Sequence, residues 1–229
     1  MSFAQVLAWL ADPAHWRGAS GVPVRVAQHL CYTALAVGIA SLIALPAGLL
    51  VGHTARGGIV LVGLANAMRA LPTLGLLAFV FLVADSQVVS ALAALVVLAV
   101  PPMLAGSYVG VCSVPPETRD AARGMGMTSM QQLWQVELPG AMPLLLGGVR
   151  SAVLQVVATT TVAAYVGLGG LGRLVLDGLN SADYPQMVAG ALLTAVLAVA
   201  LDVLLAGLAG LVLPAGVRLA ARAPREIGG

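Results

Sequence analysis

The sequence contains no lysine and has few charged residues of any kind. Charged residues make up 9% of the 229 residues, and all 11 basic residues are arginines. Without lysine the chain cannot form a phosphate-binding P-loop, which needs a Gly-Lys pair, or a Schiff-base site, which needs an amine. The net charge of +2 does not indicate a nucleic-acid surface. We therefore expect no nucleotide cofactor bound by this chain and no nucleic-acid partner.

Reactive side chains are also scarce. Two cysteines and three histidines are present, and none falls at a metal-ligand or redox spacing. Without an activated nucleophile or a His/Asp/Glu cluster, a membrane-embedded enzyme is a weak alternative, and we predict no catalytic and no metal site. We interpret Cys31 and Cys112 as small apolar packing residues. They are expected at opposite faces of the membrane, too far apart to form a disulfide.

Apolar residues dominate what remains. They form 60% of the chain, and the mean hydropathy is +0.99, which describes a membrane protein rather than a water-soluble domain. A bilayer core needs about 20 apolar residues in helical form. Five runs meet this length, so we predict an all-α polytopic protein with five transmembrane helices at residues 28–52, 58–84, 87–112, 141–166 and 186–213.

Proline interrupts three of these runs. Pro46, Pro72 and the Pro101-Pro102 pair each remove a backbone donor, so these helices should kink or break. Neighbouring helices can simply tolerate such kinks, or the kinks can serve a gate, and the sequence leaves both readings open.

Arginine placement predicts the orientation. Six arginines collect on one side (56, 119, 123, 218, 222 and 225) and three on the other (17, 25 and 173), which places the first side in the cytoplasm. Residues 1–27 then form an extracytoplasmic amphipathic segment, which lacks the basic region of a signal peptide. Residues 214–229 form a cytoplasmic tail, and the 167–185 loop faces outward. The chain is expected to be a multi-pass protein of the plasma membrane.

A polar insert, residues 113–140, separates the third and fourth runs. Its core reads "DAARGMGMTSMQQLWQVELP". Prolines and Glu117 predict the start of one short helix, and Gly124 or Gly126 its end. Thr128 to Gln131, or Ser129 to Gln132, is a capping-box pattern for a second helix, which Leu138-Pro139 should end.

The insert resembles the EAA loop of ABC importer permeases, written E-A-A-x3-G-x9-I-x-L-P. The matching anchors are Asp120, Ala121, Ala122, Gly126, Val136, Leu138 and Pro139, with Asp for Glu and Val for Ile at two of them. The resemblance implies a coupling helix seated in a separate ABC ATPase subunit, which uses ATP and magnesium. The alternative is a self-contained cytoplasmic cap that only satisfies helix ends.

Further stretches narrow the resemblance. "RALPTLGLL", "VPPMLAGSYVGV" and "AAYVGLGGLGRLVLDGLN" look like the glycine betaine, carnitine and choline permeases. This likeness implies a methionine-permease-like (MetI-like) type I ABC importer fold over residues 28–213, with osmoprotectant quaternary amines such as proline betaine as substrates. It also implies an extracytoplasmic binding protein and a second permease subunit, with a paralogous partner favoured over a homodimer. A permease for methionine or another small amine or amino acid is the alternative, because methionine-type permeases carry a close version of the glycine-rich stretch.

Candidates for a translocation path or gate follow from residue type. They are Pro72, Tyr108, Tyr165, Gly167, Gly169 and Gly170. The glycines do not follow a strand, which argues against a dinucleotide loop. They allow either close backbone packing or bending of an outer loop. Most aromatic residues are expected to contact lipid or pack, so substrate affinity should reside in the binding protein.

Three charges fall within the spans: Arg69, Arg150 and Asp202. Charges at this depth should face protein or water and seek a partner. Asp202 and Arg150 share a depth on consecutive spans, which favours their pairing, with Arg69 as the alternative partner. The simpler role for such a pair is structural, in that it fixes the register of the two helices. A secondary transporter driven by ions is the rival reading, because such carriers place carboxylates at mid-membrane.

Overall fold

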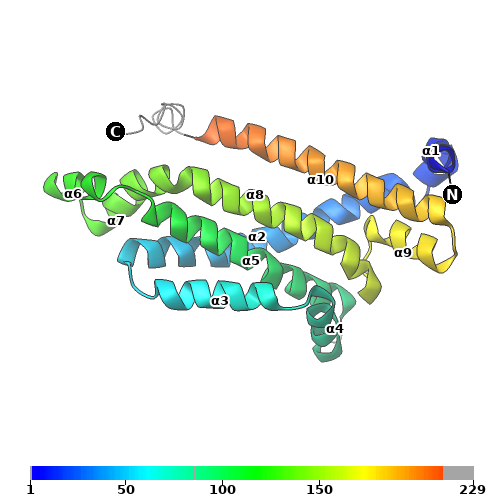
Figure 1. Ribbon diagram of the computed structural model, residues 1–229, viewed down its shortest axis with the longest axis horizontal. Coiled ribbons are helices and arrows are strands. Elements are labelled where there is room, and N and C mark those ends of the chain that lie inside the picture. The colour runs from blue at the N-terminus through cyan, green and yellow to red at the C-terminus, as the bar shows by residue number, and fades with distance from the viewer. Residues whose placement is uncertain (1, 85, 214–229) are drawn as a thin grey trace, which may run out of the picture.

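The computed structural model describes residues 2–84 and 86–213, and within them every regular element is helical. The predicted all-α class is therefore confirmed. Four helices are long and apolar enough to cross a membrane, and a bent pair supplies a fifth candidate. The predicted tail, residues 214–229, lies outside the described residues. The long helices run side by side along the long axis of the molecule (Figure 1).

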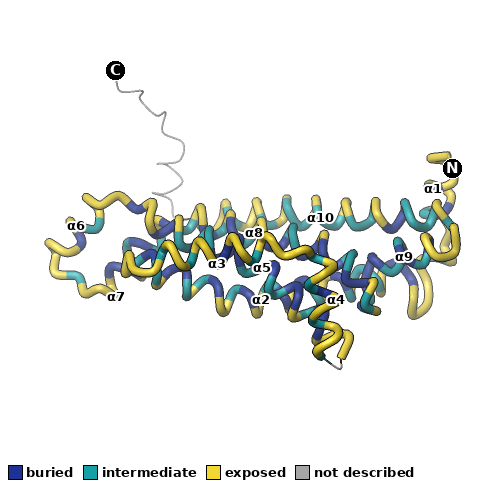
Figure 2. Tube along the Cα trace, turned by 60° about the horizontal axis from the view of Figure 1, so that its bottom comes forward, coloured by how far each residue is buried: buried dark blue, intermediate teal, exposed yellow. Residues whose placement is uncertain are grey.

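Three helices form the centre of the bundle: α2 (Val22–Thr54), α5 (Gln87–Cys112) and α8 (Leu138–Ala163). Small residues line their contacts, as in the α2 series Ala36, Ala40 and Ala44, all fully buried. A Cβ built on Gly148 of α8 would lie 2.6 Å from the backbone oxygen of Pro102 in α5. Backbones in membrane proteins approach this closely where side chains are absent. Figure 2 shows the buried residues gathered in this centre and the exposed residues on the outer helices.

The second predicted span is broken in the middle. Residues 58–84 form α3 (Gly58–Ala70) and α4 (Thr73–Val83), which are bent by 90° to each other. Pro72 is the residue that precedes α4, and it adopts an extended backbone conformation there. Pro46, Pro101 and Pro102 lie inside continuous helices. Of the three proline sites predicted to kink or break a helix, the one at position 72 therefore coincides with a break between helices.

The polar insert differs from expectation at its end. It contains α6 (Pro116–Gly124) and α7 (Ser129–Gln132), but Leu138-Pro139 does not stop the second helix. A π-helical turn, η2 (Leu133–Glu137), continues α7 directly into α8. In this turn the Leu138 N–H donates to the Leu133 carbonyl, five residues earlier. The wider turn accommodates the proline ring and its missing donor, which would obstruct an ordinary α-helical ladder.

The opposite end of the bundle carries the N-terminal segment. It holds α1 (Phe3–Ala11), the short η1 (Pro13–Trp16) and α9 (Gly172–Asn180), and α10 (Tyr184–Val212) begins there (Figure 1). Val6 and Trp9 of α1 are buried in one cluster with Leu171, Leu174 and Ala189. The structure corrects two boundaries: α2 begins at Val22 rather than residue 28, and the predicted 167–185 loop contains a helix.

Candidate functional site

The polar insert projects from one end of the bundle as two short helices with a tight turn between them (Figure 1). Gly126 sits in that turn with a φ of +80°, a conformation that favours glycine. Thr128 caps α7 through a reciprocal pair. The Gln131 N–H donates to Thr128 Oγ1 over 3.3 Å, and the Thr128 N–H donates to Gln131 Oε1 over 2.8 Å. The first of the two predicted capping patterns is therefore the one used.

The seven anchors of the insert occupy three kinds of position. Asp120, Ala121 and Gly126 are exposed at the tip, while Ala122 is buried. The other three are half-buried where the insert joins α8: Val136, Leu138 and Pro139. The exposed anchors are thus available to another protein. The remaining anchors pack the insert against its own chain.

A buried carboxylate holds the insert to the bundle. Glu137 is 1% exposed, and His53 Nδ1 from the last turn of α2 donates to its Oε2 over 2.6 Å. Arg119 of α6 forms an ion pair with Glu137 Oε1 at 3.3 Å, and Gln132 Nε2 donates to the same oxygen at 3.3 Å. Ser129 Oγ lies 2.6 Å from His53 Nε2. One side chain therefore connects η2 with α2, α6 and α7.

Arg119 adds a further link to the bundle. Its Nη2 donates to the backbone carbonyl of Val111 near the end of α5. Charge-assisted bonds in a nearly dry position are stronger than neutral ones at the surface. The insert is consequently fixed to the ends of both α2 and α5, in addition to being continuous with α8.

Two of the three charges in the spans form an ion pair. Arg150 of α8 donates to Asp202 of α10 through Nε and through Nη2, the latter over 2.5 Å to Oδ2. Arg150 lies about 18 Å along α8, and Asp202 lies about 15 Å from the end of α10. A bidentate arrangement lets the planar guanidinium satisfy both carboxylate oxygens. The pair also joins α8 to α10.

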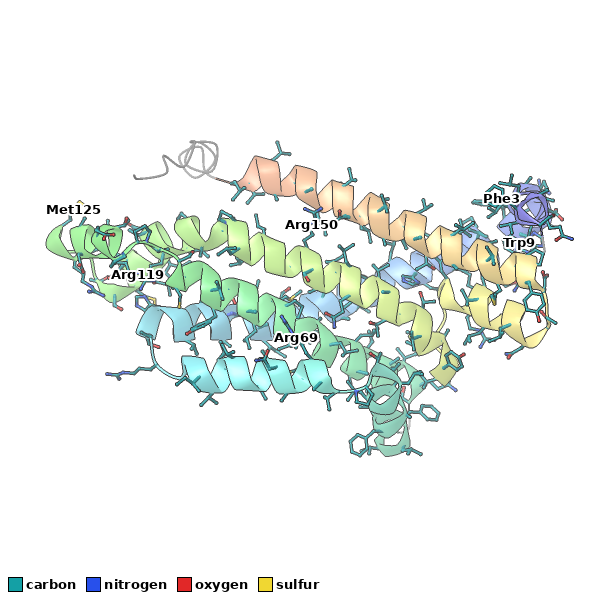
Figure 3. All side chains as sticks on the ribbon, in the orientation of Figure 1. Phe3, Trp9, Arg69, Arg119, Met125 and Arg150 are labelled. Carbon is teal, nitrogen blue, oxygen red and sulfur yellow. The ribbon has the colours of Figure 1, made fainter. Side chains whose placement is uncertain are left out.

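Arg69, the alternative partner, lies elsewhere. With Asn66 of α3 and Tyr108 of α5 it lines a groove of about 140 Å³ between those helices. Figure 3 places the Arg69 label between α3 and α5, well away from that of Arg150. The groove lies on the helix that ends at the Leu71-Pro72 break.

The glycine-rich loop packs tightly against the start of α2. The Gly170 N–H donates to Gln28 Oε1 over 3.0 Å, and the Leu171 N–H donates to His29 Nδ1 over 3.3 Å. His29 is fully buried, and its Nε2 then carries the proton and donates to the Val157 carbonyl at 3.0 Å. Gly167 and Gly170 have φ of +88° and +92°. These glycines therefore have a packing and conformational reason to be glycine.

The path and gate candidates do not form one cluster. Tyr108 lines the same groove as Arg69, with its hydroxyl group against Gly58 at the start of α3, whereas Tyr165 is 62% exposed at the end of α8 with Gly167, Gly169 and Gly170. Helix α4, which begins after Pro72, contacts the Tyr165 turn, η3 (Ala164–Val166). The broken span thus touches the glycine-rich region.

Several residues of these sites were not predicted from the sequence to form these contacts. They are His29, His53, Arg119, Gln132 and Glu137. Their common signal is a polar side chain in or directly beside a long apolar run, where a partner is required. Pairing them requires knowing which helix ends meet. Within the described residues, no group of three or more His, Cys, Asp or Glu side chains is placed to hold a metal ion.

Comparison with protein families gives a match to most of the chain. Residues 44–215 match the family described as "Binding-protein-dependent transport system inner membrane component". The osmoprotectant import permease protein OsmW of Salmonella typhimurium is 35% identical over 196 residues, covering 83% of this chain and 91% of the relative. The choline transport system permease protein OpuBB of Bacillus subtilis is 31% identical over 191 residues, covering 83% and 88%.

A second Salmonella relative and a solved structure extend these likenesses. The osmoprotectant import permease protein OsmY is 35% identical over 181 residues, covering 78% of this chain and 77% of the relative. An inward-facing structure of the MetNI methionine ABC transporter is 22% identical, with a TM-score of 0.72, covering 91% of this chain and 98% of that chain. At 22% identity, the likeness to the MetNI structure concerns the fold alone.

Proposed function

The chain belongs to the family of binding-protein-dependent transport system inner membrane components and is a multi-pass permease subunit of an ABC importer, and we propose that it carries quaternary-amine osmoprotectants. Support comes from relatives at 30–35% identity that are named for osmoprotectant, choline, carnitine or glycine betaine transport. The chain is a transport subunit and not an enzyme. ATP and magnesium bind to the ATPase subunit in this proposal.

The polar insert is the part that the ATPase subunit grips. The observation that carries this assignment is its construction: an exposed tip at Asp120, Ala121 and Gly126 on a base anchored through buried Glu137. Because α7 continues through η2 into α8, movement of the tip is transmitted to a membrane helix without an intervening flexible loop. A cap that only satisfied helix ends would need no such continuity.

The remaining partners and the orientation follow from the same assignment. The insert faces the cytoplasm, where the ATPase lies, so α1 and α9 face outward and meet a substrate-binding protein. A paralogous permease completes the path, as suggested by the separately named pairs OsmW with OsmY and OpuBB with OpuBD among the relatives. An ion-coupled mechanism is disfavoured because Asp202 is held by Arg150.

Two nearby glycines allow a matched test of coupling. Both Gly124 and Gly126 have open space around them within the chain, but only Gly126 has a positive φ. Gly126→Ala strains the turn by about 1–2 kcal/mol and adds a methyl group at the exposed tip. In proteoliposomes containing the whole transporter, Gly126→Ala should lower substrate-stimulated ATP hydrolysis and amine uptake by about tenfold.

Gly124→Ala is the control, because alanine favours the helical conformation already present there. It should keep ATP hydrolysis within about twofold of wild type. Equal coupling in the two variants would contradict the assignment of the tip. A second experiment measures the uptake of labelled glycine betaine with and without internal ATP, after ion gradients have been collapsed. Uptake that requires ATP and does not require the gradients would support both the substrate class and the ATP-driven mechanism.

A further inference from the structure

Arg69 is an exposed cation in the last turn of α3, where the second span breaks, and it has no partner among the described residues. It lies about 17 Å along α3 from Gly58, close to half the thickness of a bilayer core. Among the described residues, none accepts a hydrogen bond from Arg69 or forms an ion pair with it. A guanidinium at this depth is strongly disfavoured unless an anion or water meets it. The site therefore requires a negatively charged ligand or a hydrated path.

The surroundings of Arg69 form a mixed groove. Asn66 lies one turn earlier on α3, and Tyr108 faces the same groove from α5. The rest of the lining is apolar and includes Leu61 and Leu104. The groove thus combines one cation, one amide and one aromatic ring with otherwise apolar walls. This is the composition of a site for a small molecule that carries both a charged and an apolar part.

The described residues supply no free acid at the depth of Arg69. Asp202 is the acid inside α10, and both its oxygens are engaged by Arg150. Glu137 lies at the end of the bundle and is held by His53 and Arg119. A second copy of the chain would bring the same, already paired groups. The anion that meets Arg69 must come from outside the described part of this sequence.

On the basis of the proposed function, we infer that Arg69 binds the carboxylate of a zwitterionic substrate as it crosses the membrane. Glycine betaine and carnitine carry such a carboxylate, whereas choline carries only the quaternary ammonium and a hydroxyl group. A guanidinium binds a carboxylate with two parallel hydrogen bonds and repels a simple cation. The quaternary ammonium has no proton to donate and interacts with aromatic faces, a role open to Tyr108 in the same groove.

The test compares two substrates in one reconstituted transporter. The complete complex, with wild-type binding protein, is placed in proteoliposomes with internal ATP, and uptake of labelled glycine betaine and labelled choline is measured. Arg69→Gln should lower glycine betaine uptake by about tenfold or more, because a charged hydrogen-bonded contact is lost. Choline uptake should change by less than about twofold, since it has no carboxylate to lose.

Two further variants complete the design. Arg69→Lys keeps the charge but not the fork, so it should lower glycine betaine uptake about threefold to tenfold with choline uptake unchanged. Arg56→Gln removes an exposed arginine just before α3 and should alter neither substrate. If the Arg69→Gln transporter does not assemble, the uptake of the two substrates by Arg69→Lys tests the inference by itself.

The outcomes separate this inference from the proposed function. If wild type imports neither amine, the substrate class itself is wrong, and the inference is overturned with it. If wild type imports both but Arg69→Gln and Arg69→Lys lower them equally, Arg69 contacts an acid of the second permease subunit instead. Unchanged uptake of both substrates in both variants would place Arg69 outside the path.

Discussion

Glu137 joins four helical segments through one carboxylate. The group is almost completely buried, and it receives contacts from His53, Arg119 and Gln132. Removing one member of a buried charged network costs more than its net contribution, since the other members are left without a partner. At the scale of single residues, the insert is therefore most sensitive at its base, whereas its exposed tip is free to meet another protein.

Glu137→Gln should destabilise the permease while keeping the side chain's size. The amide leaves the Arg119 guanidinium without its counter-charge, and we expect a loss of about 2 kcal/mol, or roughly 4–8 °C in melting temperature. The measurement is thermal unfolding of the purified permease in detergent. Asp120→Asn is the control, because the Asp120–Arg123 pair is largely exposed and should shift stability by less than about 1 kcal/mol. Equal effects in the two variants would contradict the role of Glu137.

The Arg150–Asp202 pair makes a second prediction at this scale. Asp202→Asn should lower the yield of folded protein, because Arg150 then faces the membrane interior unpaired. The double variant Arg150→Asp with Asp202→Arg should recover part of that yield. Val203→Asn, at a neighbouring exposed position of α10, measures the cost of an added amide alone. If the double variant folds no better than Asp202→Asn, the pair is not what holds the two helices.

At the scale of helices, small residues decide how α5 and α8 approach each other. Gly148 faces the backbone of α5, and a Cβ there would meet the Pro102 oxygen at 2.6 Å and Gly106 Cα at 3.0 Å. Neither atom is the end of a flexible side chain, so neither can move aside cheaply. Gly147, its neighbour on α8, has open space around it. The two glycines therefore separate the effect of packing from that of helix propensity.

Gly148→Ala should lower the stability of the bundle by about 1–3 kcal/mol, because it overpacks the contact between α5 and α8. Gly147→Ala should be neutral or stabilising by up to about 1 kcal/mol, since alanine favours the helix. Thermal unfolding in detergent and the yield of monodisperse protein measure both effects. A neutral Gly148→Ala would show that the two helices can separate without cost.

At the scale of the whole molecule, two ends with different properties are joined by the same helices. The polar insert is continuous with α8, and α8 ends in the turn that leads to the glycine-rich loop held by Gln28 and His29. Movement at the insert therefore reaches the far end through one helix that is packed against α2 and α5. The outer face of α10 exposes apolar residues such as Val199 and Leu211. Such a face suits lipid as well as another permease helix.

The sequence by itself determined the features that depend on composition and local order. Apolar length specified the membrane helices, and the fixed spacing from Asp120 to Pro139 identified the insert. Local rules also narrowed the cap of the second helix to Thr128 or Ser129 and the end of the first to Gly124 or Gly126, because each depends on residues within a few positions. Depth along the helices was enough to favour Arg150 as the partner of Asp202.

Only the tertiary structure decided what depends on neighbours distant in sequence. The partners of Glu137 come from segments as far as 84 positions away, and those of the glycine-rich loop from 142 positions away. Sequence reasoning ended the second helix of the insert at Pro139, because it assumed an α-helical ladder in which that proline would clash. The π-helical turn removes the clash, and with it the insert becomes part of a membrane helix. Whether a proline interrupts a helix depends on how the preceding turn is wound, and which helix ends meet depends on packing across the bundle.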